Sequence, residues 1–271
     1  MEELNGENLN LLEDIAREVY SVVHPLLGTP EAGRIVGAGF GGDETRVIDE
    51  VAEQAIIQCL KRNRQSCIFI GEESGVQKIG DEPQFYLISD AVDGSTNAAR
   101  GIGFISSSLA ISPTDCLEDV EAAVVMNLVN GGLYEAKRGK GAWYNGTAIK
   151  PSQTSVLEEG VIGIDVSRAP EKVENIISLM KIVKSVRSLG SAALEICYVA
   201  SGILDAYVDL RSKLRTLDFA AGMLIVKEAG GVFLQPNGRD FNVSLTQVNR
   251  FSVIAAANKK LYKAIINLFK P

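Results

Sequence analysis

One stretch, from Gln84 to Asn97, changes from apolar to polar within a single position. Its first part, QFYLIS, is typical of a buried strand, and Asp90 and Asp93 follow it directly. Two carboxylates this close at the end of a buried strand repel each other unless water or a cation neutralises them, and hard divalent cations such as Mg²⁺ prefer oxygen ligands. Gly94 then lets the backbone approach a ligand closely. The stretch therefore predicts a cation site where a buried strand ends.

The next three residues predict a phosphate beside that cation. Ser95, Thr96 and Asn97 are residue types that cap helices, so free backbone N–H groups and a partial positive charge would face the ligand. An ordinary polar turn would use the same residue types, because Asp, Gly, Ser and Asn all populate turns. These two interpretations cannot be separated from this stretch alone.

Two further segments place acids at the ends of predicted elements. Glu72 and Glu73 follow CIFI, a second strand of the buried type. Asp218 opens the apolar helix of TLDFAAGMLIVKEAGG. Three segments that each carry an acid at an element's end favour one shared site over three unrelated turns.

Composition limits the class of partner. The chain has 271 residues, of which 27 are Lys or Arg and 34 are Asp or Glu, giving a net charge of -7. This balance argues against a general nucleic-acid binder, so an anionic substrate would need bound metal or a local arginine. The widely spaced Cys59, Cys67, Cys116 and Cys197 indicate neither a zinc site nor a disulfide framework, and we expect buried thiols. Without a signal core or an apolar run of about 18 residues, we expect a cytoplasmic protein with no membrane partner.

Hydrophobic periodicity predicts an α/β protein in two parts. Residues 1–150 would form an α+β part with an amphipathic helix near the N-terminus, a polar loop over residues 76–83 and an antiparallel meander. Residues 151–271 alternate strands with helices, the pattern of an α/β domain. The polar run KPSQTSVLEEG is the predicted linker between the two parts.

These motifs resemble the inositol monophosphatase family of lithium-sensitive, Mg²⁺-dependent sugar and inositol phosphatases. In that family an acid follows GE, then comes D-x-x-D-G-[ST], and D-x-A-A-G lies towards the C-terminus. The present chain carries GEES, DAVDGS and DFAAG in the same order, and the match runs from about Asp43 to Gly231. The resemblance implies a layered αβαβα sandwich, an active site between the two parts, two or three Mg²⁺ ions per site and a homodimer.

The resemblance also implies a set of metal ligands and catalytic groups. The first ion would be held by Glu72, Asp90 and the carbonyl of Val92, and the second by Asp90, Asp93 and Asp218. Glu72 would also reach a third ion. The metals would activate a water that attacks the phosphate, with Asp49 and Ser95 as base and relay.

Substrate contacts are implied in three places. The family resemblance assigns them to Asp93, Gly94, Ser95, Arg187, Gly190, Ser191, Ala192 and Arg211. Arg211 stands seven positions before Asp218, where inositol-preferring animal relatives have Glu and archaeal dual-specificity relatives have Arg. A guanidinium suits a second phosphate. We therefore expect a phosphomonoesterase that hydrolyses inositol 1-phosphate and fructose 1,6-bisphosphate.

Three other functions stay open on the sequence. A 3'(2'),5'-bisphosphate nucleotidase would use the same motifs. An NAD-dependent oxidoreductase would use Gly37-x-Gly39-x-x-Gly42, although the strand before it is very short and the next candidate strand ends too far downstream. A noncatalytic sugar-phosphate sensor would keep the pocket with misplaced metals. The resemblance instead makes residues 37–44 a mobile loop over the metals, with Gly41 where archaeal relatives commonly carry an acid.

Overall fold

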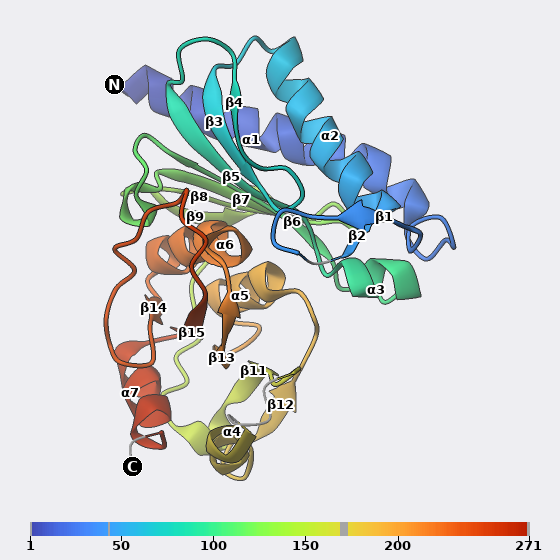
Figure 1. Ribbon diagram of the computed structural model, residues 1–271. Helices are drawn as coiled ribbons and strands as arrows, with labels where there is room; N and C mark the ends of the chain where they lie inside the picture. The colour runs from blue at the N-terminus through green and yellow to red at the C-terminus, as the bar shows by residue number, and fades with distance from the viewer. Residues whose placement is uncertain (1, 43, 169–172, 270–271) are drawn as a thin grey trace.

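The computed structural model describes residues 2–42, 44–168 and 173–269. Helices and sheets alternate in layers (Figure 1). From one side to the other these are α1 with α2, an eight-stranded sheet, α5 with α6, a five-stranded sheet, and α4 with α7. This is the αβαβα sandwich that the family resemblance predicts, and the fold prediction is confirmed.

The first sheet lies under α1 (Glu2–Val23) and α2 (Val47–Arg62), and its strand order is β10-β9-β8-β7-β6-β5-β3-β4. β3 and β5 run parallel, and every other neighbouring pair is antiparallel. The carboxyl ends of β3 and β5 therefore lie side by side. The strands are β3 (Cys67–Gly71), β4 (Gly75–Ile79), β5 (Phe85–Asp93), β6 (Ser106–Ser112), β7 (Ala122–Asn127), β8 (Leu133–Lys137), β9 (Gly141–Tyr144) and β10 (Thr147–Ala148).

The second sheet has the order β12-β11-β13-β15-β14 and mixes parallel with antiparallel pairs. Its strands are β11 (Val161–Asp165), β12 (Ser185–Arg187), β13 (Ala206–Leu214), β14 (Val232–Leu234) and β15 (Phe251–Ala256). The helices of this half are α4 (Val173–Met180), α5 (Ala192–Ala200), α6 (Thr216–Ala229) and α7 (Lys259–Asn267).

Smaller elements join these layers at the site end. The hairpin of β1 (Ile35–Ala38) and β2 (Glu44–Arg46) leads into α2, and α3 (Ser95–Arg100) follows β5. Single 3₁₀ turns cover His24–Leu26, Leu117–Asp119 and Leu157–Glu159.

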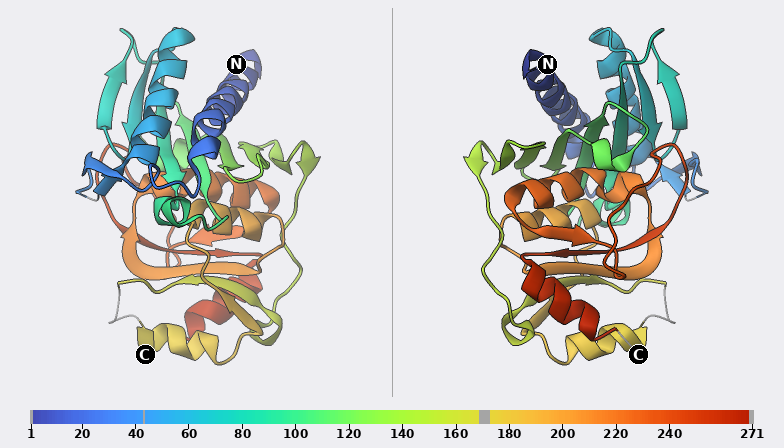
Figure 2. Two further views of the ribbon diagram at one scale, coloured as in Figure 1. Left: turned by 90° about the vertical axis from the view of Figure 1, so that its right-hand side faces the viewer. Right: turned by 90° about the vertical axis from the view of Figure 1, so that its left-hand side faces the viewer.

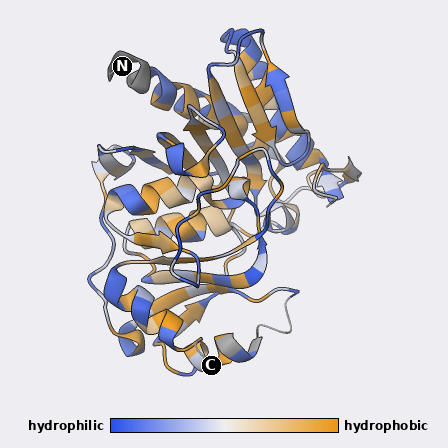
Figure 3. Ribbon diagram, turned by 60° about the vertical axis from the view of Figure 1, so that its left-hand side comes forward, coloured by the Kyte–Doolittle hydropathy of each residue, from blue (hydrophilic) through white to orange (hydrophobic). Residues whose placement is uncertain are grey.

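The helices α5 and α6 fill the space between the two sheets (Figure 2). Their buried faces, which include Leu194 and Phe219, form one core with Val125 of β7 and Phe233 of β14. The rings of Phe219 and Phe233 are stacked with centroids 5.5 Å apart. Figure 3 shows that hydrophobic residues make up much of the strands of both sheets and of the helices between them. Helices of the C-terminal half thus pack on the N-terminal sheet, and a division at residues 150 and 151 stays a prediction.

Two local predictions need correction. The first half of the predicted loop over residues 76–83 belongs to β4, which pairs antiparallel with β3 at the edge of the sheet. The glycine fingerprint begins at Gly37 in β1 and ends at Gly42 in the turn before β2. No helix follows Gly42 directly, although a dinucleotide site requires one there. The oxidoreductase interpretation loses its support for that reason. Asp43 and residues 169–172 lie outside the described residues.

None of the helices in the described ranges has the length and apolarity needed to cross a bilayer. The four cysteines are free, and Cys59, Cys67 and Cys197 are buried as expected, whereas Cys116 is half-buried.

Candidate active site

The predicted acidic residues meet at one end of the eight-stranded sheet. In the parallel pair β3 and β5, Gly71 lies opposite Ser89, so Glu72 and Asp90 follow at the same edge. Asp218 reaches this edge from the first turn of α6, where its charge helps to raise the pKa of Glu72 and of Asp90. The structure thus brings together acids that are far apart in the sequence.

Burial dominates the electrostatics of this cluster. It raises the pKa of Glu72 to about 7 and the pKa of Asp93 to about 6, and it raises the pKa of Asp90 well above its usual range. Repulsion between the carboxylates adds to each rise. A buried cluster of this kind binds protons or cations strongly.

Arg215 supplies a positive charge inside the cluster. Its Nη2 atom donates to Glu72 Oε1 at 2.6 Å and to Asp218 Oδ1 at 3.0 Å. The side chain of Arg215 is 13% exposed, so these ion pairs are partly shielded from water. The sequence interpretation missed Arg215, because its contact with Glu72 joins positions that are far apart in the chain.

The chemistry of the donor set fits a hard cation. Glu72, Asp90, Asp93 and Asp218 offer only oxygen atoms, the ligands that Mg²⁺ prefers. Across the described residues, however, no three acidic, His or Cys side chains are already arranged around one common point. The ion pairs with Arg215 explain this in part, since they orient Glu72 and Asp218 towards the guanidinium. Val92, the predicted carbonyl ligand, is buried beside the cluster, and its N–H donates to Asp90 Oδ1 at 3.2 Å.

Asp93 connects the cluster to the predicted substrate turn. Its Oδ2 atom accepts hydrogen bonds from Ser191 Oγ and from the Ala193 N–H, both at 2.7 Å. The N–H of Ala192 also lowers the pKa of Asp93 and opposes the effect of burial. The last residue of β5 thereby holds the first turn of α5 against the acidic cluster.

Two glycines let the turns before α3 and α5 touch. Gly94 has a φ of 98°, and a Cβ there would lie 3.1 Å from the carbonyl oxygen of Gly190. Gly190 has a φ of 89°, and Asn97 Nδ2 bonds the neighbouring Leu189 carbonyl at 2.7 Å. Side chains at either glycine would be strained and would push these turns apart. The predicted contacts Gly94, Ser95, Gly190, Ser191 and Ala192 therefore lie together around Asp93.

Two buried glutamates fix the loops that carry site residues. Glu53 of α2 accepts the N–H groups of Glu73 and Ser74 at 3.0 and 2.8 Å, directly after Glu72. Glu195 of α5 accepts the N–H groups at positions 189 and 190 at 3.0 and 3.2 Å. Burial raises the pKa of Glu195 to about 7. Neither glutamate was predicted from the sequence.

The start of α2 lies next to the start of α3. Asp49 is buried, and its Oδ2 atom accepts the Arg46 N–H at 3.0 Å. The side chain of Arg46 then donates to Ser95 Oγ at 3.2 Å and to Thr96 Oγ1 at 3.3 Å. Burial, with the charges of Glu73 and Glu53, raises the pKa of Asp49 to about 7. The predicted base and relay are thus joined through Arg46, which the sequence interpretation missed.

A cavity of about 860 Å³ opens beside the cluster. It is lined by more basic than acidic side chains, the basic ones being Arg168, Arg211, Lys213, Arg215 and Arg250. Two of them, Arg211 and Lys213, lie in a bulged part of β13, where the β13–β15 register shifts between Asp209 and Leu214 and Ser212 has a φ of 55°. This local excess of cations stands out in a chain with a net charge of -7.

Arg211 lines this cavity but is already paired. Its Nε and Nη2 atoms bond the carboxylate of Asp209 at 2.6 to 3.1 Å, and its Nη1 atom lies 2.7 Å from Asp165 Oδ2. Arg187 lies elsewhere: it is exposed on β12, donates to Ser185 and Val186, and is not among the described residues that line the cavity. Their predicted substrate contacts remain predictions.

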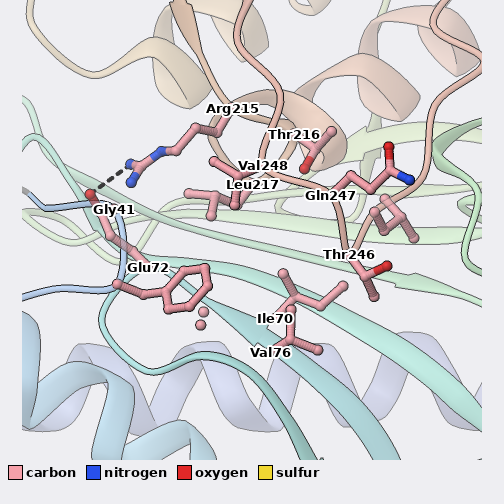
Figure 4. Close-up of a pocket in the computed structure, with 14 residues that line it drawn as sticks. Gly41, Ile70, Glu72, Val76, Arg215, Thr216, Leu217, Thr246, Gln247 and Val248 are labelled. Atoms are coloured by element: carbon pink, nitrogen blue, oxygen red, sulfur yellow. Dashed lines mark hydrogen bonds and ion pairs between the residues drawn. The ribbon is translucent and has the colours of Figure 1, made fainter.

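A second, smaller cavity lies on the other side of Arg215. The close-up in Figure 4 draws Arg215 and Glu72 beside the apolar side chains of Ile70, Leu217 and Val248. Gly41 of the glycine-rich turn also lines it, and the Phe40 N–H donates to the Glu73 carbonyl at 3.0 Å. Arg215 thus separates an apolar space from the basic cavity.

Comparison with known proteins gives a consistent result. A sequence model of the Inositol monophosphatase family matches residues 8–271. A fructose-1,6-bisphosphatase/inositol-1-monophosphatase from Methanothermobacter thermautotrophicus is 38% identical over 93% of this chain and 92% of its own length. A bifunctional NADP phosphatase/NAD kinase from Methanococcus maripaludis is 33% identical over 96% of this chain, which spans 49% of that relative. The solved extragenic suppressor protein suhB from Bartonella henselae superposes with a TM-score of 0.85 at 28% identity, covering 97% of this chain and 98% of that one.

Proposed function

This chain belongs to the inositol monophosphatase family and is a phosphoric monoester hydrolase, and we propose that it hydrolyses inositol 1-phosphate and fructose 1,6-bisphosphate with Mg²⁺ as cofactor. The observation that carries the proposal is a group of four carboxylates from three segments of the chain, set against a basic cavity. Asp90 and Asp218 are buried, and Glu72 and Asp93 are half-buried. Such a site can hold cations on one side and a phosphate on the other.

The cations would be held by Glu72, Asp90, Asp93 and Asp218, with the carbonyl of Val92. When bound, Mg²⁺ lowers the pKa of a water molecule and neutralises the charge of the phosphate. The number of ions, two or three, stays a prediction, as does the role of residues 37–44 in binding a third.

Asp49 and Ser95 provide the proton transfer. A carboxylate with a pKa of about 7 is well matched to a general base at neutral pH. Arg46 donates to Ser95 Oγ, so the Ser95 hydroxyl proton is free to bond a water or the substrate. The Arg46 N–H meanwhile holds the Asp49 carboxylate in the first turn of α2.

The phosphate of the substrate would lie where the first turns of α3 and α5 meet. Gly94, Ser95, Ser191 and Ala192 surround that point, and Asp93 fixes its geometry. A second phosphate would lie in the basic cavity, which Lys213 and Arg250 line together with Arg211. Arg211 itself would shape this pocket through its pairs with Asp209 and Asp165 and contribute charge.

Release of inorganic phosphate tests the proposal. The purified chain is assayed with inositol 1-phosphate and with fructose 1,6-bisphosphate, first with Mg²⁺ and then with EDTA. We expect turnover of both substrates with Mg²⁺ and none with EDTA. Turnover that persists in EDTA would contradict the metal dependence, whereas binding of both compounds without phosphate release would indicate a sugar-phosphate sensor.

A nucleotide phosphatase is the second candidate. The cavity is large for an inositol phosphate, and the Methanococcus maripaludis relative, about half of which (49%) this chain spans, is named as a bifunctional NADP phosphatase/NAD kinase. The same assay with NADP and with adenosine 3',5'-bisphosphate ranks these substrates by kcat/KM. Homodimer formation and a cytoplasmic location stay predictions.

A further inference from the structure

Arg215 uses oxygen atoms that the proposed cations would need. One atom, Nη2, bonds both Glu72 Oε1 and Asp218 Oδ1, at 2.6 and 3.0 Å. The backbone N–H of Arg215 takes the remaining Asp218 oxygen, Oδ2, at 2.7 Å. Both oxygens of Asp218 and one of Glu72 are therefore occupied by a single residue.

Arg211, which lines the same cavity, is a fully paired arginine and serves as a comparison. Its Nε, Nη1 and Nη2 atoms all have carboxylate partners, Asp209 and Asp165, and neither acid is a predicted metal ligand. Arg215 is less well satisfied, because its Nε atom is buried and has no hydrogen-bond partner in the described part of the chain. Buried donors in folded proteins are nearly always hydrogen-bonded, so the unpaired Nε indicates that Arg215 is held less firmly than Arg211.

The surroundings of Arg215 both strengthen its ion pairs and allow them to break. On one side, the buried apolar side chains of Ile70 and Leu217 lie beside Arg215 and lower the local dielectric constant, which strengthens the attraction to Glu72 and Asp218 (Figure 4). On the other side, Arg215 lines the large basic cavity, which gives the guanidinium room to turn away.

We propose that the Arg215 guanidinium is the internal counter-ion of the acidic cluster and that it competes with Mg²⁺ for Glu72 and Asp218. Arg215 thereby sets the Mg²⁺ concentration at which the site loads. The inference rests on the proposed Mg²⁺ dependence and extends it from the ligands to a residue that opposes their loading. Arg215 affects Mg²⁺ binding by holding the carboxylates of Glu72 and Asp218, and it touches neither the substrate nor the reacting atoms.

Calorimetric titration of Mg²⁺ into the metal-free protein, without substrate, tests the competition. The variant Arg215→Met keeps the backbone N–H that bonds Asp218 and removes the charge. We expect it to bind Mg²⁺ at least about fivefold more tightly than the wild type, because one unit of opposing charge is lost close to the ion. The matched variant Arg211→Met loses a charge in the same cavity and should stay within about twofold of the wild type, since Arg211 contacts no predicted ligand.

Thermal melting provides a second readout. In EDTA, Arg215→Met should melt below the wild type, because it leaves buried carboxylates without a cation. Saturating Mg²⁺ should close that gap, so the variant gains more from the ion than the wild type does. Should Arg215→Met fail to fold, Arg215→Gln is measured against the same criteria.

Each result decides the matter. Equal or weaker Mg²⁺ binding by Arg215→Met, with normal binding by the wild type, overturns the competition and leaves the proposed function intact. Tightening of the same size in Arg211→Met overturns it as well, because the effect would then be one of general charge. A wild type that binds no Mg²⁺ overturns both this inference and the proposed metal dependence.

Discussion

Two helices of the site begin in the same way. At the start of α2, the Arg46 N–H donates to Asp49, and at the start of α6, the Arg215 N–H donates to Asp218. In both, an arginine lies just before the helix and an aspartate follows three positions later. Both aspartates are buried, at 6% and 8% exposure. The backbone and the residue types are matched, so any difference in role comes from where the arginines point.

The two arginine side chains have different partners. Arg46 reaches the hydroxyls of Ser95 and Thr96, whereas Arg215 reaches the carboxylate of Glu72 and that of its own Asp218. Burial raises the pKa of Asp49 to about 7, although the hydrogen bond and the charge of Arg46 oppose the rise. The same Arg–Asp motif at a helix start therefore supports two different roles in our proposal, proton transfer at α2 and cation binding at α6.

The largest effect is expected at α6. In Asp218→Asn, the amide oxygen can still accept the Arg215 N–H, so the helix start is kept. A neutral amide is a poor Mg²⁺ ligand, so kcat/KM for inositol 1-phosphate should fall by about a thousandfold or more. Circular dichroism checks that the variant is folded. Activity within about tenfold of the wild type would show that Asp218 does not serve the cation.

A smaller loss, with a distinct pH dependence, is expected at α2. Asp49→Asn should lower kcat by about a hundredfold, the typical contribution of a general base. In the wild type, kcat should rise as the pH increases through about 7, because Asp49 must lose its proton to act as a base. The variant should lack that rise. An unchanged pH profile in Asp49→Asn would assign the rise to another group.

Substitution of Arg46 should lower kcat less than substitution of Asp49 does. Arg46→Met removes the donor to Ser95 Oγ and keeps the N–H that holds Asp49. We expect kcat to fall by about tenfold with little change in KM, since a positioning hydrogen bond is lost. Arg17→Met, which removes an exposed arginine of α1, is the matched control. Equal effects of the two variants would remove Arg46 from the proton-transfer group.

A separate prediction concerns the stability of the protein without metal. Asp49, Glu72 and Asp93 have folded pKa values of about 7, 7 and 6, above the value of about 4 in an unfolded chain. The folded protein thus binds more protons in this range, so its free energy of unfolding in EDTA should fall as the pH rises from about 4 to about 7. Urea unfolding at several pH values should show a drop on the order of a few kcal/mol. A rise over this range would mean that the acids are ionised throughout.

Most of the fold was predictable because helices and strands leave patterns in short, continuous stretches of the sequence. Apolar periodicity and strand-ending acids predicted the helices and strands, and the family motifs implied the layered sandwich. The missed strand β4 is an edge strand in which exposed Val76 and Lys78 blur the alternation. Such a strand looks like a loop in the sequence.

The arginines of the site could not be assigned from the sequence. Their roles depend on contacts between distant positions, such as Arg215 with Glu72, and on the bulge at Ser212 that turns part of β13 into the cavity. Arg211 attracted the prediction because of its position before Asp218, yet the structure pairs it with Asp209 and Asp165. The repeated spacing of Arg and Asp at the starts of α2 and α6 was the signal available in the sequence.

Calorimetric Mg²⁺ binding to the wild type, Asp218→Asn and Asp49→Asn tests the difference between the two helix starts most directly. If α6 binds the cation and α2 transfers the proton, Asp218→Asn should weaken binding by at least about thirtyfold, roughly 2 kcal/mol, while Asp49→Asn stays within about threefold of the wild type. Equal weakening in both variants, or normal binding by Asp218→Asn, would contradict that division of roles.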